Sequence, residues 1–237
     1  MNNLIGTGFY SVGDDKAKRD LAWRWETLIS PRPFVVIDNS GLGYPLEHNP
    51  FRRVVRIQHN LGHVEQFYGK AGSPQLLGWS MSWIQSALIA YSELRDFLYI
   101  EQDCLVFGPW EAALAAHIET NKLAACFGDP VGELGVEQSF FWISWGAILD
   151  VIALYLDYPP DAEFLPERKF KRLFHSRRDI GRLPFGVGRN RPFPRDRSPF
   201  YIQKITPEEM EDLCPSVKPT VTTVTPDNSD PPASSLT

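Results

Sequence analysis

The chain has 237 residues, of which 43% are hydrophobic and 22% are charged, with 15 Phe and 7 Trp among them. This length predicts one domain with a sizeable core rather than two full catalytic domains, and the composition excludes a disordered or fibrous protein. The formal net charge of -5 conceals a concentration of cations in residues 168–197.

The first part of the chain alternates between strand and helix patterns. Leu4–Tyr10 is a short, mainly apolar run that predicts a strand, and apolar residues at helical spacing predict a helix over Lys16–Ile29. Phe34–Ile37 is an apolar run between Pro33 and a turn sequence, which is typical of a strand buried on both faces of a parallel sheet. Arg53–Ile57 predicts the next strand.

The same alternation continues through the middle of the chain. Leu76–Leu94 predicts a long helix, and Phe97–Ile100 repeats the pattern of a buried strand. Pro109 begins a helix that extends to about Asn121, and Leu123–Phe127 predicts another strand. Strands that alternate with helices in this way indicate βαβ units.

The last third of the chain has weaker patterns. Ser139–Ile143 predicts one more strand and Trp145–Leu156 a helix, and regular periodicity then fades over residues 161–199. Phe200–Ile205 predicts a short strand, and Thr206 opens a brief helix as its capping-box residue.

These elements predict an α/β fold, in which a single domain over residues 1–214 has a mainly parallel central sheet flanked by helices. Residues 215–237 are rich in Pro, Thr, Ser and Asp, and we expect a disordered tail there. Residues 161–199 form a basic, irregular segment of the domain.

The apolar stretches and the cysteines bear on location. The longest apolar stretches, around residues 87–91 and 148–156, are shorter than the roughly 20 residues that span a bilayer, so we expect no transmembrane segment. The N-terminal residues lack the pattern of a signal peptide. Cys104, Cys126 and Cys214 lie far apart without a CxxC pair. We therefore expect reduced thiols in a cytoplasmic protein.

Two acidic residues, Glu101 and Asp103, follow the buried strand Phe97–Ile100 directly. In an extended chain residues i and i+2 point to the same side, so these carboxylates would project together past the strand end, where open α/β sheets bind ligands. Two such carboxylates repel unless a cation lies between them. Mg²⁺ and Mn²⁺ are commonly held by one or two carboxylates while substrate phosphates complete the shell. The sequence thus predicts a metal–diphosphate site.

The run DFLYIEQD from Asp96 to Asp103 resembles the strand and DxD motif of GT-A glycosyltransferases, with Glu101 in place of the first Asp. The resemblance covers roughly residues 4–160 as an ordered set of elements. It implies a single GT-A-like domain related to the Rossmann fold. It also implies transfer of a sugar from a nucleotide sugar, especially a UDP-sugar, with Mn²⁺ or Mg²⁺ bound by Asp103 and Glu101.

The resemblance also implies which residues hold the donor. Leu4–Tyr10 is similar to the first nucleotide-binding strand and Val35–Asn39 to the second, which assigns uracil and ribose contacts to Thr7, Gly8, Asp38 and Asn39. Asp38 is the strongest candidate of these, because a carboxylate at a strand end can accept hydrogen bonds from the ribose hydroxyls. These residue types are also ordinary in turns, so a purely structural role stays open.

An inverting enzyme of this fold needs a general base for the acceptor hydroxyl. Glu137 is the first candidate, because it comes directly before an apolar run and resembles the acidic residue after the acceptor loop in several such families. Asp129 is the second candidate. A retaining enzyme requires no such base, so both stereochemical outcomes stay open.

The basic segment 168–197 contains eleven Lys and Arg against two acids, a formal charge of about +9. We expect an anion site there, in which Arg177 and Arg178 contact the donor diphosphate or a phosphate-bearing acceptor. His175 lies in the same segment and is a candidate third metal ligand. A solvated face is the alternative interpretation of such a charge run.

Two other functions compete with glycosyl transfer. A nucleotidyltransferase of similar architecture would have a Gly-rich, basic loop after the first strand, which the sequence lacks, and a nucleotide- or carbohydrate-binding module would lack turnover. The acceptor of a transferase could be a glycan, a lipid-linked glycan or a hydroxylated DNA base, since all suit a basic segment. DNA has the least support because the sequence contains no recognised DNA-reading motif. The oligomeric state stays open.

Overall fold

The structure is a computed structural model of the chain. It describes residues 2–10, 16–40, 43–57, 78–126, 137–157, 169–170, 173, 179–183, 200–203 and 205–213, and for 125–126, 137, 200–203, 207 and 211 the backbone alone. The chain divides into two compact units, Met1–Ile205 and Thr206–Thr237. The predicted tail 215–237 lies outside the described residues.

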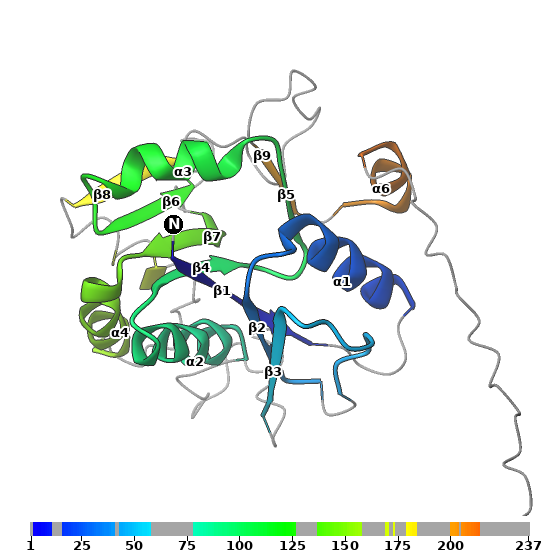
Figure 1. Ribbon diagram of the computed structural model, residues 1–237, viewed down its shortest axis with the longest axis horizontal. Coiled ribbons are helices and arrows are strands. Elements are labelled where there is room, and N and C mark those ends of the chain that lie inside the picture. The colour runs from blue at the N-terminus through cyan, green and yellow to red at the C-terminus, as the bar shows by residue number, and fades with distance from the viewer. Residues whose placement is uncertain are drawn as a thin grey trace, which may run out of the picture. The chain divides into compact units, whose positions relative to one another are not determined.

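A seven-stranded sheet in the order β3-β2-β1-β4-β7-β6-β8 forms the centre of the first unit (Figure 1). Its strands are β1 (Asn3–Phe9), β2 (Phe34–Asp38), β3 (Arg52–Arg56), β4 (Asp96–Ile100), β6 (Leu123–Cys126), β7 (Glu137–Ile143) and β8 (Ile180–Leu183). β3, β2, β1 and β4 are parallel, β7 is antiparallel to both of its neighbours, and β8 is parallel to β6. A mainly parallel sheet flanked by helices confirms the predicted fold class.

Helices cover both faces of this sheet. α2 (Gly78–Ser92) and α4 (Ile148–Leu156) lie on one face, and α1 (Lys16–Ile29) and α3 (Trp110–Ile118) lie on the other (Figure 1). A short 3-10 turn, η2 (Trp145–Ala147), leads into α4. Among the described residues, no helix combines the length and apolar character that crossing a bilayer requires.

Two short strands form a second sheet, separate from the main one. β5 (Cys104–Phe107) and β9 (Phe200–Gln203) pair with each other in antiparallel orientation. The sequence predicts β9 but neither β5 nor β8. In the second unit, the predicted capping box is confirmed at the start of α6 (Pro207–Leu213), where Thr206 Oγ1 accepts from the Glu209 amide at 3.2 Å and Glu209 Oε2 accepts from the Thr206 amide at 3.0 Å.

Aromatic side chains fill the core between the sheet and the layer of α2 and α4. Trp83 is fully buried and meets Phe141, Tyr155 and Phe170 edge to face, with centroid separations of 5.9, 5.1 and 6.4 Å. Such pairs contribute about 0.5–1.5 kcal/mol each beyond the area that they bury. This core fixes α2 against the strands whose ends carry the candidate site.

Two glycines of β1 let α2 approach the sheet closely. A Cβ on Gly6 would lie 2.5 Å from Ser86 Cβ and 2.6 Å from the Phe97 ring, and a Cβ on Gly8 would overlap the Ser82 side chain. The serines that face these glycines complete the packing, because their hydroxyls donate to backbone carbonyls of α2. The structure therefore gives Gly8 a packing role, and its predicted donor contact stays a prediction.

This close approach makes Gly6→Ala destabilising. Overpacking of a close-packed interior costs about 1–3 kcal/mol, and we expect a decrease of that size in the free energy of unfolding, measured by urea denaturation. Gly146→Ala is the matched control, since a Cβ at Gly146 meets no described atom within 4 Å and the change should be neutral or slightly stabilising. Equal losses in both variants would contradict the packing role of Gly6.

Candidate functional site

The carboxyl ends of β1, β2 and β4 reach one edge of the sheet, where the antiparallel strand β7 begins. The chain passes from β1 to β2 and β3 on one side and then returns to β4 on the other side of β1, so the strand order reverses between β1 and β4. In open α/β sheets, ligands bind outside the carboxyl ends of the strands at such a reversal. The topology therefore indicates a ligand site beside Glu101 and Asp103.

Residues 101–104 form a turn rather than extended chain. The Cys104 amide donates to the Glu101 carbonyl with an N···O distance of 2.9 Å, which closes the turn between β4 and β5. The prediction that Glu101 and Asp103 lie in extended chain and point to the same side is therefore wrong. The physical reason is burial of the next segment. Cys104 and Leu105 are both 0% exposed and belong to β5, so the chain must turn after Glu101 to reach the sheet of β5 and β9.

The carboxylate of Glu101 is held by β7. Ser139 Oγ donates to Glu101 Oε2 at 2.6 Å, and the Glu101 amide donates to the Ser139 carbonyl at 2.9 Å. Ser139 is buried, so this hydrogen bond fixes the orientation of the carboxylate. Sequence reasoning missed Ser139, because the only signal for it was the strand pattern of its segment.

Tyr99 connects the two acidic residues with the end of β1. Burial, followed by the negative charges of Glu101 and Asp103, raises the pKa of the Tyr99 hydroxyl well above its usual range, and the backbone of Gly8 forms a hydrogen bond with this group. Tyr99 is 1% exposed. The charges of both acids therefore act on one buried hydroxyl, which is also hydrogen-bonded to the backbone of Gly8.

Asp38 ends β2 as a fully buried carboxylate. Its Oδ1 accepts from the Ser40 amide at 2.9 Å and from Ser40 Oγ at 2.5 Å. Its Oδ2 lies 3.5 Å from Arg56 Nε and accepts no hydrogen bond from any residue within the described ranges. One oxygen is therefore committed to the turn after the strand. The other oxygen keeps its capacity to accept a hydrogen bond.

The other two predicted donor residues at the strand ends are also buried. Thr7 is 1% exposed, and its Oγ1 has no hydrogen-bond partner in the part of the chain that the structure describes. The Asn39 amide donates to the Phe9 carbonyl at 2.9 Å and so extends the pairing of β1 with β2. The structure places Asp38 and Asn39 at the carboxyl end of β2, whereas Thr7 lies two residues before the end of β1 and pairs with Val36. Donor binding by all three stays a prediction.

The structure describes one of the two candidate general bases, Glu137, and not the other. Glu137 is the first residue of β7 and pairs with Cys126 at the end of β6, on the same edge of the sheet as Glu101. Asp129 lies outside the described residues. Of the two candidates the structure describes only Glu137, and that by its backbone, so the catalytic role of either residue stays a prediction.

The basic segment 168–197 lies mostly outside the described residues, and His175, Arg177 and Arg178 are among those not described. Lys169 is described and is only 6% exposed, with Nζ 5.5 Å from the centre of the Tyr155 ring. Burial lowers the pKa of Lys169. At this residue the segment is part of the core rather than a solvated face.

A divalent cation fits the chemistry of Glu101 and Asp103. Within the described ranges, no three His, Cys, Asp or Glu side chains converge so as to hold a metal ion. Mg²⁺ and Mn²⁺ sites at phosphate-transfer centres need only one or two protein carboxylates, because substrate phosphates and water complete the shell. The hydrogen bond from Ser139 to Glu101 is the kind of support that orients a metal-binding carboxylate.

No protein-family model and no curated protein matches the sequence. Among solved structures, the galactosyltransferase LgtC with donor and acceptor sugar analogs is 12% identical, with a TM-score of 0.47 over 76% of this chain and 72% of that chain. A glycosyltransferase involved in glycosylation of the major capsid of PBCV-1 is 16% identical, with a TM-score of 0.40 over 77% of this chain and 80% of that chain. GlyE from Streptococcus pneumoniae TIGR4 is 12% identical, with a TM-score of 0.45 over 77% of this chain and 45% of that chain. This similarity concerns the fold alone and gives no information about the reaction or the substrates of this chain.

Proposed function

We propose that the chain is a metal-dependent glycosyltransferase of the GT-A type that transfers a sugar from a UDP-sugar to an acceptor hydroxyl. The observation that carries the proposal is the pair of carboxylates, Glu101 and Asp103, in the turn after β4 at the reversal of strand order. The electrostatic effect of both acids on the buried Tyr99 hydroxyl supports their proximity.

In this proposal, Asp103 and Glu101 hold Mn²⁺ or Mg²⁺, which would neutralise the charge that develops on the departing nucleoside diphosphate. Ser139 keeps the Glu101 carboxylate in one orientation. Asp38 Oδ2 accepts a hydrogen bond from the nucleoside, and Thr7 Oγ1 donates or accepts one; among the described residues neither atom has a hydrogen-bond partner. Glu137 removes the proton from the acceptor hydroxyl.

The acceptor we propose is a hydroxyl compound that carries phosphate, such as a lipid-linked glycan. Support comes from the charge of about +9 in residues 168–197, which favours anionic partners. The segment contains Arg177 and Arg178, which we propose as phosphate contacts, and His175, which we propose as a further metal ligand.

A panel of nucleotide sugars, incubated with Mn²⁺ or Mg²⁺ and with candidate acceptors, tests the function. We expect metal-dependent release of a nucleoside diphosphate from one of the donors. Release of pyrophosphate from a nucleoside triphosphate would indicate a nucleotidyltransferase instead. Binding of a nucleotide sugar without any release would indicate a binding module, and failure to bind or cleave any donor would overturn the proposal.

A further inference from the structure

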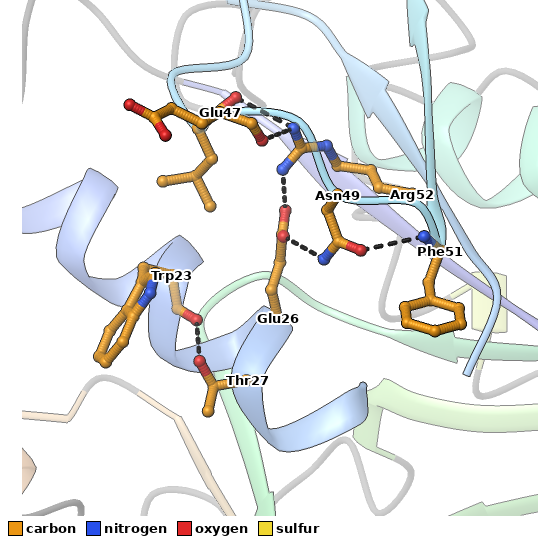
Figure 2. A network of polar contacts seen from close by, with 8 residues as sticks. Trp23, Glu26, Thr27, Glu47, Asn49, Phe51 and Arg52 are labelled. Carbon is orange, nitrogen blue, oxygen red and sulfur yellow. Dashed lines mark hydrogen bonds and ion pairs between the residues drawn. The ribbon is translucent and has the colours of Figure 1, made fainter. Parts of the chain in front are cut away.

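A buried ion pair between Glu26 and Arg52 is hydrogen-bonded to the loop between β2 and β3. Arg52, the first residue of β3, places its NH1 atom 2.6 Å from Oε1 of Glu26 in α1, and the two side chains are only 7% and 8% exposed (Figure 2). A buried charge is expensive unless it is paired and fully hydrogen-bonded. The pair must therefore have further partners, and the loop supplies them.

Backbone and side chains of the loop surround the pair (Figure 2). Asn49 Nδ2 donates to Glu26 Oε2 at 2.9 Å, and Arg52 NH2 donates to the carbonyl of Leu46 at 3.0 Å and to that of Glu47. Both carboxylate oxygens of Glu26 and two loop carbonyls are thus engaged. The ion pair and residues 46–49 therefore hold each other in place through these hydrogen bonds.

Tyr44 extends the network toward the edge of the sheet. The Arg52 guanidinium lies over the Tyr44 ring, 4.8 Å from its centre, and the Tyr44 hydroxyl forms a hydrogen bond with Glu26. Burial, followed by the charge of Glu26, raises the pKa of Tyr44, so the hydroxyl stays protonated and donates to the carboxylate. The ring meets Phe9 edge to face at 4.9 Å, and Phe9 pairs with Asp38 across β1 and β2.

The residue next to Tyr44 is hydrogen-bonded to the turn that holds Asp38. The Gly43 amide donates to Ser40 Oγ at 3.2 Å, and Ser40 Oγ in turn donates to Asp38 Oδ1 at 2.5 Å. Gly43 has a φ of 96°, which favours glycine, and a Cβ there would overlap the guanidinium of Arg56, the residue that lies beside Asp38 Oδ2. An unbroken series of contacts therefore joins Glu26 and Arg52 to the Asp38 carboxylate.

We propose that Glu26 and Arg52 are positioning residues for donor binding, because they hold Tyr44 and Gly43 and thereby fix the Asp38 carboxylate. The proposal rests on the proposed function, in which Asp38 contacts the nucleoside. Neither residue touches the donor. Their loss displaces the loop and weakens donor affinity, while the chemical step at Glu101 and Asp103 is retained.

The test compares Glu26→Gln with a variant of a second Glu–Arg ion pair, which is more exposed: its Arg32 and Glu111 side chains are 31% and 42% exposed. Glu111→Gln breaks the pair of Glu111 with Arg32, whose guanidinium also lies over an aromatic ring, that of Trp110 at 5.2 Å. We expect Glu26→Gln to raise the Kd for UDP with Mn²⁺ about 10-fold and the donor KM in parallel, with kcat at saturating donor changed less than about twofold. Glu111→Gln should leave Kd, KM and kcat unchanged.

Tyr44→Phe is the second variant, because Glu26→Gln leaves a buried charge unpaired and could fail to fold. It keeps the ring against Phe9 and removes only the hydrogen bond to Glu26, so we expect a Kd for UDP raised about threefold. Hydrogen exchange should be faster in residues 43–51 of Glu26→Gln than in Glu111→Gln. If the wild type binds UDP and Tyr44→Phe binds it equally well, the positioning role is overturned. A wild type that binds no nucleotide sugar overturns the proposed function itself.

Discussion

Replacing Asp103 by Ala is expected to abolish metal-dependent turnover and to leave the fold intact. Asp103 lies in the turn after β4, outside the strand ladder, and its charge reaches the Tyr99 hydroxyl together with that of Glu101. A metal ion contributes several kcal/mol to stabilisation of a developing charge, which corresponds to a rate decrease of about 10³-fold. The decrease should appear in kcat, with an unchanged far-UV circular dichroism spectrum and melting temperature.

Glu101 should contribute less, and its replacement requires a variant that keeps the Ser139 partner. Glu101→Ala would leave the Ser139 hydroxyl buried without its acceptor, which costs about 1–3 kcal/mol of stability, whereas Glu101→Gln retains an acceptor oxygen. Asp150→Ala is a control, since Asp150 is exposed on α4. EDTA should remove the activity of the wild type and of the control alike. A wild-type rate that neither EDTA nor Asp103→Ala lowers would overturn the metal site.

Local patterns in the sequence predicted the elements that carry the site. The helical spacing of apolar residues gave α1 with its observed bounds, Lys16–Ile29, and the apolar run Phe34–Ile37 gave a strand that is buried throughout. These predictions succeed because each pattern reflects burial of the segment itself: one stripe for a helix, both faces for a central strand. They also placed Asp38 and Glu101 at strand ends.

Contacts between distant segments could not be predicted in this way. β5 has four residues, and its partner β9 follows much later in the chain, so no local pattern reports the pairing. The direction of β7 could not be predicted from the sequence either, because a buried strand is apolar whether it runs parallel or antiparallel to its neighbours. Ser139 meets Glu101 only because β7 is antiparallel to β4.

One residue of the buried Glu26–Arg52 ion pair could be recognised from the sequence pattern. Glu26 follows Ala22 by four residues and precedes Ile29 by three, so it lies on the buried stripe of α1. An acidic residue on such a stripe requires a cationic or hydrogen-bonding partner. The sequence does not say that the partner is Arg52, because the loop that brings it there has no periodicity.

Glu137→Gln is expected to lower kcat by about 10²–10⁴-fold while the Kd for the donor stays the same, because the amide keeps the shape of the side chain but cannot accept a proton. The place of Glu137 motivates this expectation: it begins β7 on the edge of the sheet where β4 ends and Glu101 follows. Glu119→Gln makes the same chemical change at an exposed residue after α3 and should leave kcat unchanged.

The pH dependence of kcat separates a general base from a residue that only binds the acceptor. Protonation of a catalytic carboxylate removes its function, so kcat of the wild type should fall as the pH decreases, and the residual kcat of Glu137→Gln should lack that limb of the profile. A binding role would raise the KM for the acceptor and leave the profile unchanged. An undiminished kcat in Glu137→Gln would assign the base to Asp129 or indicate a retaining mechanism, and the configuration of the product at the anomeric carbon would distinguish these two cases.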